Sequence, residues 1–279
     1  MARRRRATAT PDSPPGPGRP RTALGLAIGL VVVLAGALAY RYGLPDRHAD
    51  RPSVLLVTID TLRADRLGAY GGPAPTPVLD ALAARGARFA TAIAPAPLTA
   101  PSHASILSAR IPPRHGVRDN GGFVLPDSVP VVAARFREAG YATAAFVSGF
   151  PLDRRFGLAR GFDTYDDRLP RGRDARRAPY VERPADQTTG AALGWIAGRT
   201  GRWFVWVHYF DPHAPYEPPA EFGPPRTSTP YDGEIAFVDR EVGRLLAGIG
   251  DPERTLVLVT ADHGESLGDH GEETHGVFV

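Results

Sequence analysis

The run Ser53-Val54-Leu55-Leu56-Val57-Thr58-Ile59-Asp60 decides the fold, because it is a continuous apolar stretch that ends on an acid. Its β-forming residues and its lack of a polar face are typical of a strand buried in a parallel sheet. Two later runs, residues 203–209 and 255–260, have the same character and predict buried strands. Weaker patterns predict further strands over residues 141–147 and 88–93.

Helical patterns separate these strands. Thr76-Pro77 has the form of a helix start, a cap residue followed by a first-turn proline, and predicts a helix ending near Arg85. Further helices are predicted over residues 101–109, 128–139, 185–198 and 232–247. This alternation predicts an α/β fold, with a mainly parallel sheet covered by helices on both faces. The charged, proline-rich residues 165–186 predict an exposed loop.

Acids and histidines follow three of the predicted strands. Asp60 ends the first, Asp211 and His213 follow the second, and Asp262 and His263 follow the third. We expect them to share one rim, because ligands of such sheets bind beyond the carboxyl ends of the strands. Asp60, Asp262 and His263 predict one divalent metal ion, with Mn²⁺, Zn²⁺ or Mg²⁺ favoured over Ca²⁺, which prefers six to eight oxygens. Each of these residues alone could also be a helix cap or a turn residue.

The segment Thr99-Ala100-Pro101-Ser102-His103 offers a nucleophile. Thr99 lies where a helix N-cap would lie, and a cap is the simpler interpretation. A hydroxyl there also faces the positive end of the helix dipole, and free backbone N–H groups can hold an anion. A cation bound to this oxygen would lower its pKa and make it nucleophilic. Ser102 and Ser105 are alternative hydroxyls inside the predicted helix.

A proline-rich turn carries the candidate acid. His208, Asp211 and His213 lie in VHYFDPHAPYEPP, and His213 could protonate a leaving oxygen or could simply be a packed loop histidine.

Composition excludes disulfide bonds, metal sites made of cysteine thiolates, and any mechanism that needs a cysteine nucleophile or a lysine ammonium group. The 279-residue chain is 43% hydrophobic and 23% charged, which indicates a folded core, and it has no cysteine and no lysine. Residues 1–51 carry a net charge of +6, so the remainder of this +3 chain is mildly acidic. This distribution argues against nucleic acid as a partner.

The amino-terminal region predicts a membrane segment. Residues 1–21 are a basic, Pro/Gly-rich tail with arginines at 3–6, and residues 22–40 are nineteen residues without a charge. This length suits a membrane-spanning helix, and the arginine bias places the amino terminus in the cytoplasm and the folded domain outside. A secretory signal cleaved after Ala37-Leu38-Ala39, giving a secreted protein, is the alternative. Residues 41–52 are expected to be a linker.

Five motifs make the chain recognisable. They are VLLVTIDTLRADRLGAYG, TPVLDALAARGARF, APLTAPSHASILSARIPPRHGV, HYFDPHAPY and TADHGESLGDHGEETHG, in this order. From about Ser53 to the last residue, the chain resembles the sulfatase family of the alkaline-phosphatase-like superfamily. The resemblance implies a metal-dependent ester hydrolase domain over residues 53–279 that lacks the carboxy-terminal part of most relatives.

The resemblance also implies roles for single residues. Asp60, Asp262 and His263 match metal ligands, and Thr99 lies where sulfatases carry the Cys or Ser that becomes formylglycine. His213 matches the histidine near the leaving group. His275 falls where relatives place a residue that contacts the ester oxygens, and His103 replaces the arginine of the nucleophile motif. Both histidines are expected to bind substrate by contacting its non-bridging oxygens.

The departures from the family pattern shape the expected function. Threonine is not a formylglycine precursor, so none is expected, and Thr99 itself is the predicted metal-bound nucleophile. Thr61 replaces the second amino-terminal aspartate of the family. The expected activity is hydrolysis of sulfuric or phosphoric (di)esters in a small molecule, glycan or lipid head group. An inactive binding module and a phosphoethanolamine- or phosphoglycerol-type transferase are the alternatives.

Overall fold

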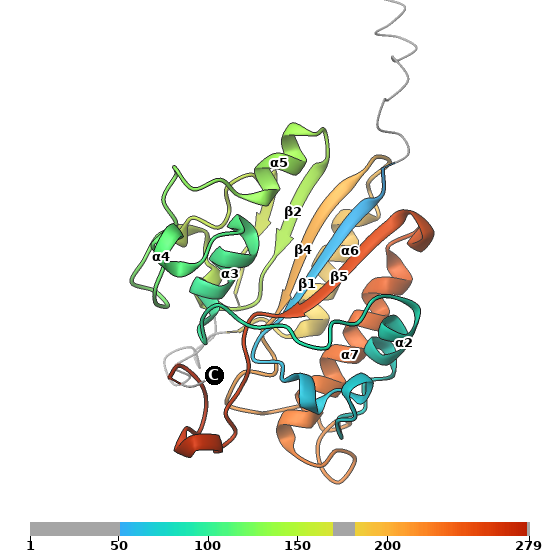
Figure 1. The fold of residues 1–279 in the computed structure, drawn as a ribbon. Helices are drawn as coiled ribbons and strands as arrows, with labels where there is room; N and C mark the ends of the chain where they lie inside the picture. The colour runs from blue at the N-terminus through green and yellow to red at the C-terminus, as the bar shows by residue number, and fades with distance from the viewer. Residues whose placement is uncertain (1–50, 170–181, 278–279) are drawn as a thin grey trace, which may run out of the picture. The chain divides into compact units, whose positions relative to one another are not determined.

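A computed structural model describes residues 51–169 and 182–277, and its centre is a five-stranded parallel sheet (Figure 1). The strands are β1 (Ser53–Ile59), β2 (Ala142–Phe146), β3 (Thr164–Asp166), β4 (Trp203–Tyr209) and β5 (Thr255–Ala261), in the order β3-β2-β4-β1-β5. In register, Ile59 of β1 lies beside Tyr209 of β4 and Ala261 of β5. The three carboxyl ends that carry acids and histidines are therefore neighbours.

Helices cover both faces of the sheet, as the sequence predicts (Figure 1). The helices are α2 (Pro77–Arg85), α3 (Thr99–Ser108), α4 (Pro112–His115), α5 (Val132–Glu138), α6 (Ala185–Ile196) and α7 (Pro230–Gly248). Alternate side chains of β1 point to opposite faces, because the side-chain period of a strand is two. Leu55 and Val57 pack towards α6 and α7, whereas Val54 and Leu56 pack towards α3 and α5.

Two strand predictions are wrong. Residues 88–93 form no strand, and Phe89 and Ile93 are exposed. A strand needs a neighbour, and β5 already pairs with the edge of β1 that β4 leaves open. The run 255–260 is a strand, but it is the edge of the sheet among the described residues, so Leu256 and Leu258 are about half exposed rather than buried.

The predicted loop over residues 165–186 is also partly wrong. It includes most of β3 and the start of α6, and its first acid, Asp166, is buried. Arg183 lies 3.1 Å from Asp166 and compensates its charge. Charge in the sequence therefore signalled a buried ion pair rather than a solvated segment at this position.

The predicted membrane segment, residues 22–40, lies outside the described residues. Within residues 51–169 and 182–277, no helix has the length and apolarity needed to cross a bilayer.

Candidate metal centre

Asp60 is placed at the end of β1 by an unusual backbone conformation. The next residue, Thr61, has a φ of +53°, in the left-handed region that non-glycine residues rarely adopt. Three hydrogen bonds hold Thr61 in this conformation. The Thr61 N–H donates to Asp262 Oδ1 (3.3 Å), and the Thr61 hydroxyl donates to the Pro212 carbonyl (2.8 Å). The Thr61 carbonyl accepts from the Tyr231 hydroxyl (2.6 Å). The ends of β1, β4 and β5 are thus joined at Thr61.

Asp262 and His263 follow β5 and turn into the same interior. Asp262 Oδ1 accepts hydrogen bonds from the N–H groups of Thr61 and His263, whereas Oδ2 has no partner. The Nδ1 of His263 donates to the Gly264 carbonyl, so its Nε2 carries the lone pair in the neutral ring. This Nε2 lies 3.4 Å from Asp262 Oδ2 and 3.6 Å from Asp60 Oδ1. A lone pair facing two carboxylate oxygens requires a proton or a cation between them.

His208 joins this group from β4. It is fully buried, and its Nε2 lies 3.3 Å from Asp60 Oδ2 without a hydrogen bond of good geometry. His208 was not among the sequence-predicted ligands, although its position near the carboxyl end of a central strand was a usable signal.

Thr99 is the first residue of α3 rather than its N-cap, which is Leu98. The Thr99 side chain is fully buried, and its Oγ1 has no hydrogen-bond partner within the described residues. Ser102, on the same helical turn, donates to the Asp262 carbonyl at 2.5 Å and fixes this turn against the end of β5. The first turn of α3, which begins with Thr99, is therefore held against the end of β5.

The amino terminus of α3 offers fewer free N–H groups than the sequence suggested. Ala100 donates its N–H to Asn120 Oδ1 (2.8 Å), Pro101 has none, and Ser102 donates to the Leu98 carbonyl (3.1 Å). The stabilisation of an anion must therefore come mainly from side chains.

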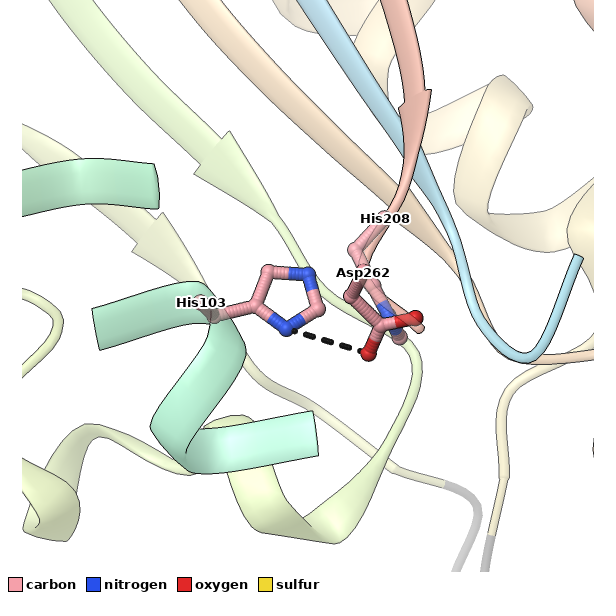
Figure 2. A group of neighbouring side chains, drawn as sticks. All are labelled: His103, His208 and Asp262. Carbon is pink, nitrogen blue, oxygen red and sulfur yellow. Dashed lines mark ion pairs between the residues drawn. The ribbon is translucent and has the colours of Figure 1, made fainter. Parts of the chain in front are cut away.

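His103 is fully buried and lies beside His208 and Asp262 (Figure 2). Its Nδ1 lies 2.8 Å from the Thr99 carbonyl and must donate to it, and its Nε2 then accepts from Thr58 Oγ1 at 3.0 Å. Its Nδ1 is also 3.4 Å from Asp262 Oδ2, the contact drawn in Figure 2. Both ring nitrogens are engaged and the ring is fully buried, so the geometry gives His103 a positioning role; its predicted contact with substrate stays a prediction.

His213 and His275 form the outer part of the site. The two rings lie 5.0 Å apart, centroid to centroid, and the His275 ring lies 4.6 Å from that of His263. His213 stacks on Phe210 and bonds through Nδ1 to the Ala214 carbonyl. His275 Nδ1 lies 3.3 Å from Glu265, a fully buried acid that sequence reasoning missed. Nothing in the loop sequence after β5 marks Glu265 as buried.

The pKa values follow from burial and from charge. Burial alone would raise the pKa of Asp60, but His208 and the charge of His263 outweigh it and lower the pKa. Burial and the nearby charge of Asp60 raise the pKa of Asp262 to about 6. Burial would lower the pKa of His263, yet the two carboxylates raise it. These opposed shifts indicate one tightly coupled cluster.

The cluster fits a divalent cation. In the part of the chain that the structure describes, six side-chain atoms at the strand ends and at the start of α3 are buried without a hydrogen-bond partner: both carboxylate oxygens of Asp60, Asp262 Oδ2, Thr99 Oγ1, His208 Nε2 and His263 Nε2. Within the described residues, two groups of three have ligand atoms within 4.8 Å of one another: Asp60, Asp262 and His263, and His103, His208 and Asp262. The first suits a metal better, because both nitrogens of His103 are already bonded. Carboxylate oxygens suit Mn²⁺ and Mg²⁺, and an imidazole nitrogen suits Zn²⁺.

Comparison with known proteins identifies the family. The family profile described as Sulfatase matches residues 52–277. The chain belongs to the sulfatase family. It is 27% identical to human arylsulfatase A over 86% of this chain and 56% of that protein, and 26% identical to an arylsulfatase of Klebsiella aerogenes over 71% and 49%. This sulfatase-family chain thus spans about half the length of these curated relatives.

Solved structures show the same fold. The phosphonate monoester hydrolase of Agrobacterium radiobacter superposes with a TM-score of 0.63 at 22% identity, covering 82% of this chain and 66% of that one. A protein solved with its substrate D-glucosamine-2-N,6-O-disulfate gives a TM-score of 0.65 at 18% identity, covering 81% and 67%. Such identities establish the α/β architecture and leave the substrate open.

Proposed function

We propose that this chain is a metal-dependent hydrolase of sulfuric or phosphoric (di)esters, with Thr99 as its nucleophile. The observation that carries the proposal is the set of unpartnered buried atoms of Asp60, Thr99, Asp262 and His263. Leaving such groups without partners costs several kcal/mol in an apoprotein, and one cation would satisfy them all. Asp60, Asp262, His263 and Thr99 would hold the metal.

The metal, when bound, would act as a Lewis acid that polarises the ester and lowers the pKa of an adjacent hydroxyl. Thr99 would lose its hydroxyl proton to solvent, its oxygen would form a bond to sulfur or phosphorus, and the bond from that atom to the departing alcohol oxygen would break. His213 would transfer a proton to that oxygen, and water would then release the acid from Thr99. His275, oriented by Glu265, would contact the non-bridging oxygens.

His213 must carry a proton before it can act as the acid, so its pKa has to be high enough for protonation in the substrate complex. Burial lowers its pKa, whereas the charge of Asp60 raises it. A bound ester anion would raise the pKa of His213 in the same direction as Asp60, which favours protonation in the substrate complex.

Threonine at position 99 favours direct attack over formylglycine chemistry. Sulfate monoesters and phosphodiesters both present a tetrahedral centre with a single negative charge, so this site could accept either. The similarity in fold to a phosphonate monoester hydrolase adds phosphonates to the substrates worth testing. Glycans are reasonable sulfated substrates, because a solved neighbour binds a glucosamine disulfate.

We also propose that the domain acts outside the cytoplasm, tethered by residues 22–40. The support is the uncharged run itself and the arginines that precede it. Cell fractionation with protease protection tests this location, and a domain digested only after the cells are opened would contradict it.

The activity is tested with the metal-reconstituted full chain. We would compare 4-nitrophenyl sulfate, bis-4-nitrophenyl phosphate and a 4-nitrophenyl phosphonate, using Thr99→Ala and Thr99→Ser in parallel. We expect turnover of at least one substrate, lost in Thr99→Ala and partly kept in Thr99→Ser. Equal rates in wild type and Thr99→Ala would remove the nucleophile assignment. Metal binding without any turnover would favour the inactive binding module.

A further inference from the structure

A polar cavity that shares no lining residue with the metal centre is lined by residues of α6 and α7 and by the segments that precede α6 and follow β4. Its volume is about 280 Å³. Six carboxyl groups and one guanidinium line it, together with Pro184, Pro219 and Phe237; the charged residues are Glu182, Asp186, Asp211, Glu217, Glu221, Glu234 and Arg240. The lining combines a strong excess of negative charge with an apolar wall.

Asp211 sets this cavity apart from an ordinary acidic surface. Its side chain is only 5% exposed, and Oδ1 accepts a hydrogen bond from the N–H of Ala185 at the start of α6 (2.8 Å). The other oxygen, Oδ2, belongs to the cavity lining and is buried without a hydrogen-bond partner among residues 51–169 and 182–277. A buried carboxylate oxygen in this condition needs a donor from a ligand.

The lining arginine does not supply that donor. Arg240 bonds through Nε to Glu241 (3.1 Å) and through Nη1 to Glu221 (3.3 Å), and its guanidinium lies over the rings of Phe222 and Phe237. These contacts of Arg240 involve neither Asp211 nor Glu234, which are left for another cation. Burial first, and then the neighbouring acids, raise the pKa of Asp211 to about 8 and that of Glu234 to about 8.

The geometry argues against a bare metal ion. Among the described residues, the only trios of acids or histidines with ligand atoms within 4.8 Å of one another lie at the metal centre. No three of the described acids in this cavity are close enough together to bind one metal ion directly. A larger cation can satisfy separated carboxylates through its N–H groups and place its carbon atoms against Pro184, Pro219 and Phe237.

We propose that this cavity binds an organic primary ammonium group, with Asp211 and Glu234 as the anionic partners. The site is separate from the ester-cleaving centre, so its occupancy does not depend on the proposed activity. The cavity is electrostatically linked to the ester-cleaving centre through Glu182. Burial, the charge of Glu217 and the charge of Asp60 together raise the pKa of Glu182 to about 7.

The test is calorimetric titration of the full chain at pH 8.5 with ethanolamine and putrescine. Ethylene glycol and 1,4-butanediol serve as uncharged analogues, and sodium chloride keeps the ionic strength constant. We expect binding of an amine but not of the diols. Asp211→Asn, which keeps an oxygen for the Ala185 N–H, should weaken binding at least tenfold, and Glu234→Gln should weaken it several-fold. Glu253→Gln, an exposed acid outside the cavity, should leave it unchanged.

Several results would overturn the proposal. One is amine binding that survives both cavity substitutions, or equal heats from the diols. Another is Ca²⁺ or Mg²⁺ binding that is lost in Asp211→Asn while no amine binds, because the ligand would then be a metal.

Discussion

At the scale of single residues, the chemistry depends on which polar atoms are left without partners. The sequence placed Asp60, Asp262 and His263 at one rim because parallel strands end together, and the structure confirms that juxtaposition. It gave His208 no place in the metal cluster, although the residue lies near the carboxyl end of a predicted buried strand, and it did not predict Glu265, whose burial depends on packing from elsewhere in the chain. Nor did it show that His103 would be bonded at both nitrogens.

Thr99→Ala should lower kcat about 1000-fold or more in the metal-loaded chain, because the variant retains the binding residues but has no nucleophile. Thr99→Ser should keep measurable turnover. Steady-state kinetics with the best aryl ester measures both, and metal analysis confirms equal loading. A kcat within tenfold of wild type for Thr99→Ala would show that another group attacks.

His103→Phe should act on stability rather than on substrate affinity. The substitution leaves the Thr99 carbonyl without its donor and Thr58 without its acceptor, which we expect to cost about 2 kcal/mol in the free energy of unfolding. Urea denaturation measures this cost. If stability is unchanged and KM alone rises, His103 contacts substrate, as the family resemblance implied.

Metal affinity should rise with pH. The folded-state pKa of Asp262 is raised to about 6 and that of His263 is raised above its usual value, so both groups hold protons that a cation must displace. Affinity should therefore fall by at least tenfold between pH 7 and pH 5. Titrations with Mn²⁺ across this range, with the chain shown to be folded at each pH, measure the slope. A flat profile would mean that neither group ligates the metal.

At the scale of elements, the site depends on how α3 is fixed to the end of β5. Ser102 donates to the Asp262 carbonyl across the two elements, whereas Ser108, at the other end of the helix, donates to Ala104 within the same helix. The sequence predicted α3 but began it two residues late, at Pro101 rather than Thr99. It could not predict the Ser102 contact, because that contact depends on tertiary packing.

Ser102→Ala should therefore lower kcat about tenfold and cost about 1 kcal/mol of stability, because Thr99 would lose its fixed position. Ser108→Ala is the matched control, and its stability cost should not be accompanied by a loss of kcat. Kinetics and urea denaturation of the pair distinguish positioning from general destabilisation. Equal effects on kcat would contradict the positioning role.

At the scale of the whole molecule, the sequence predicted the layers better than the edges. Apolar runs and amphipathic helices were sufficient for a parallel sheet with helices on both faces. Periodicity could not show that β5 lies at the edge with Leu256 and Leu258 half exposed, or that residues 88–93 have no strand to pair with. Both outcomes depend on which strands are neighbours, and a single run of sequence does not contain that information.

The central claim is that residues separated by about two hundred positions meet around one divalent cation beside Thr99. Calorimetric titration of the chelator-treated full chain with Mn²⁺ or Zn²⁺ tests it most directly, with Asp60→Asn and Asp262→Asn beside Asp269→Asn, an acid outside the cluster. We predict one ion per chain for wild type and Asp269→Asn, and affinity weakened at least a hundredfold in the other two. No binding by wild type, or binding unaffected by Asp60→Asn and Asp262→Asn, would contradict the account.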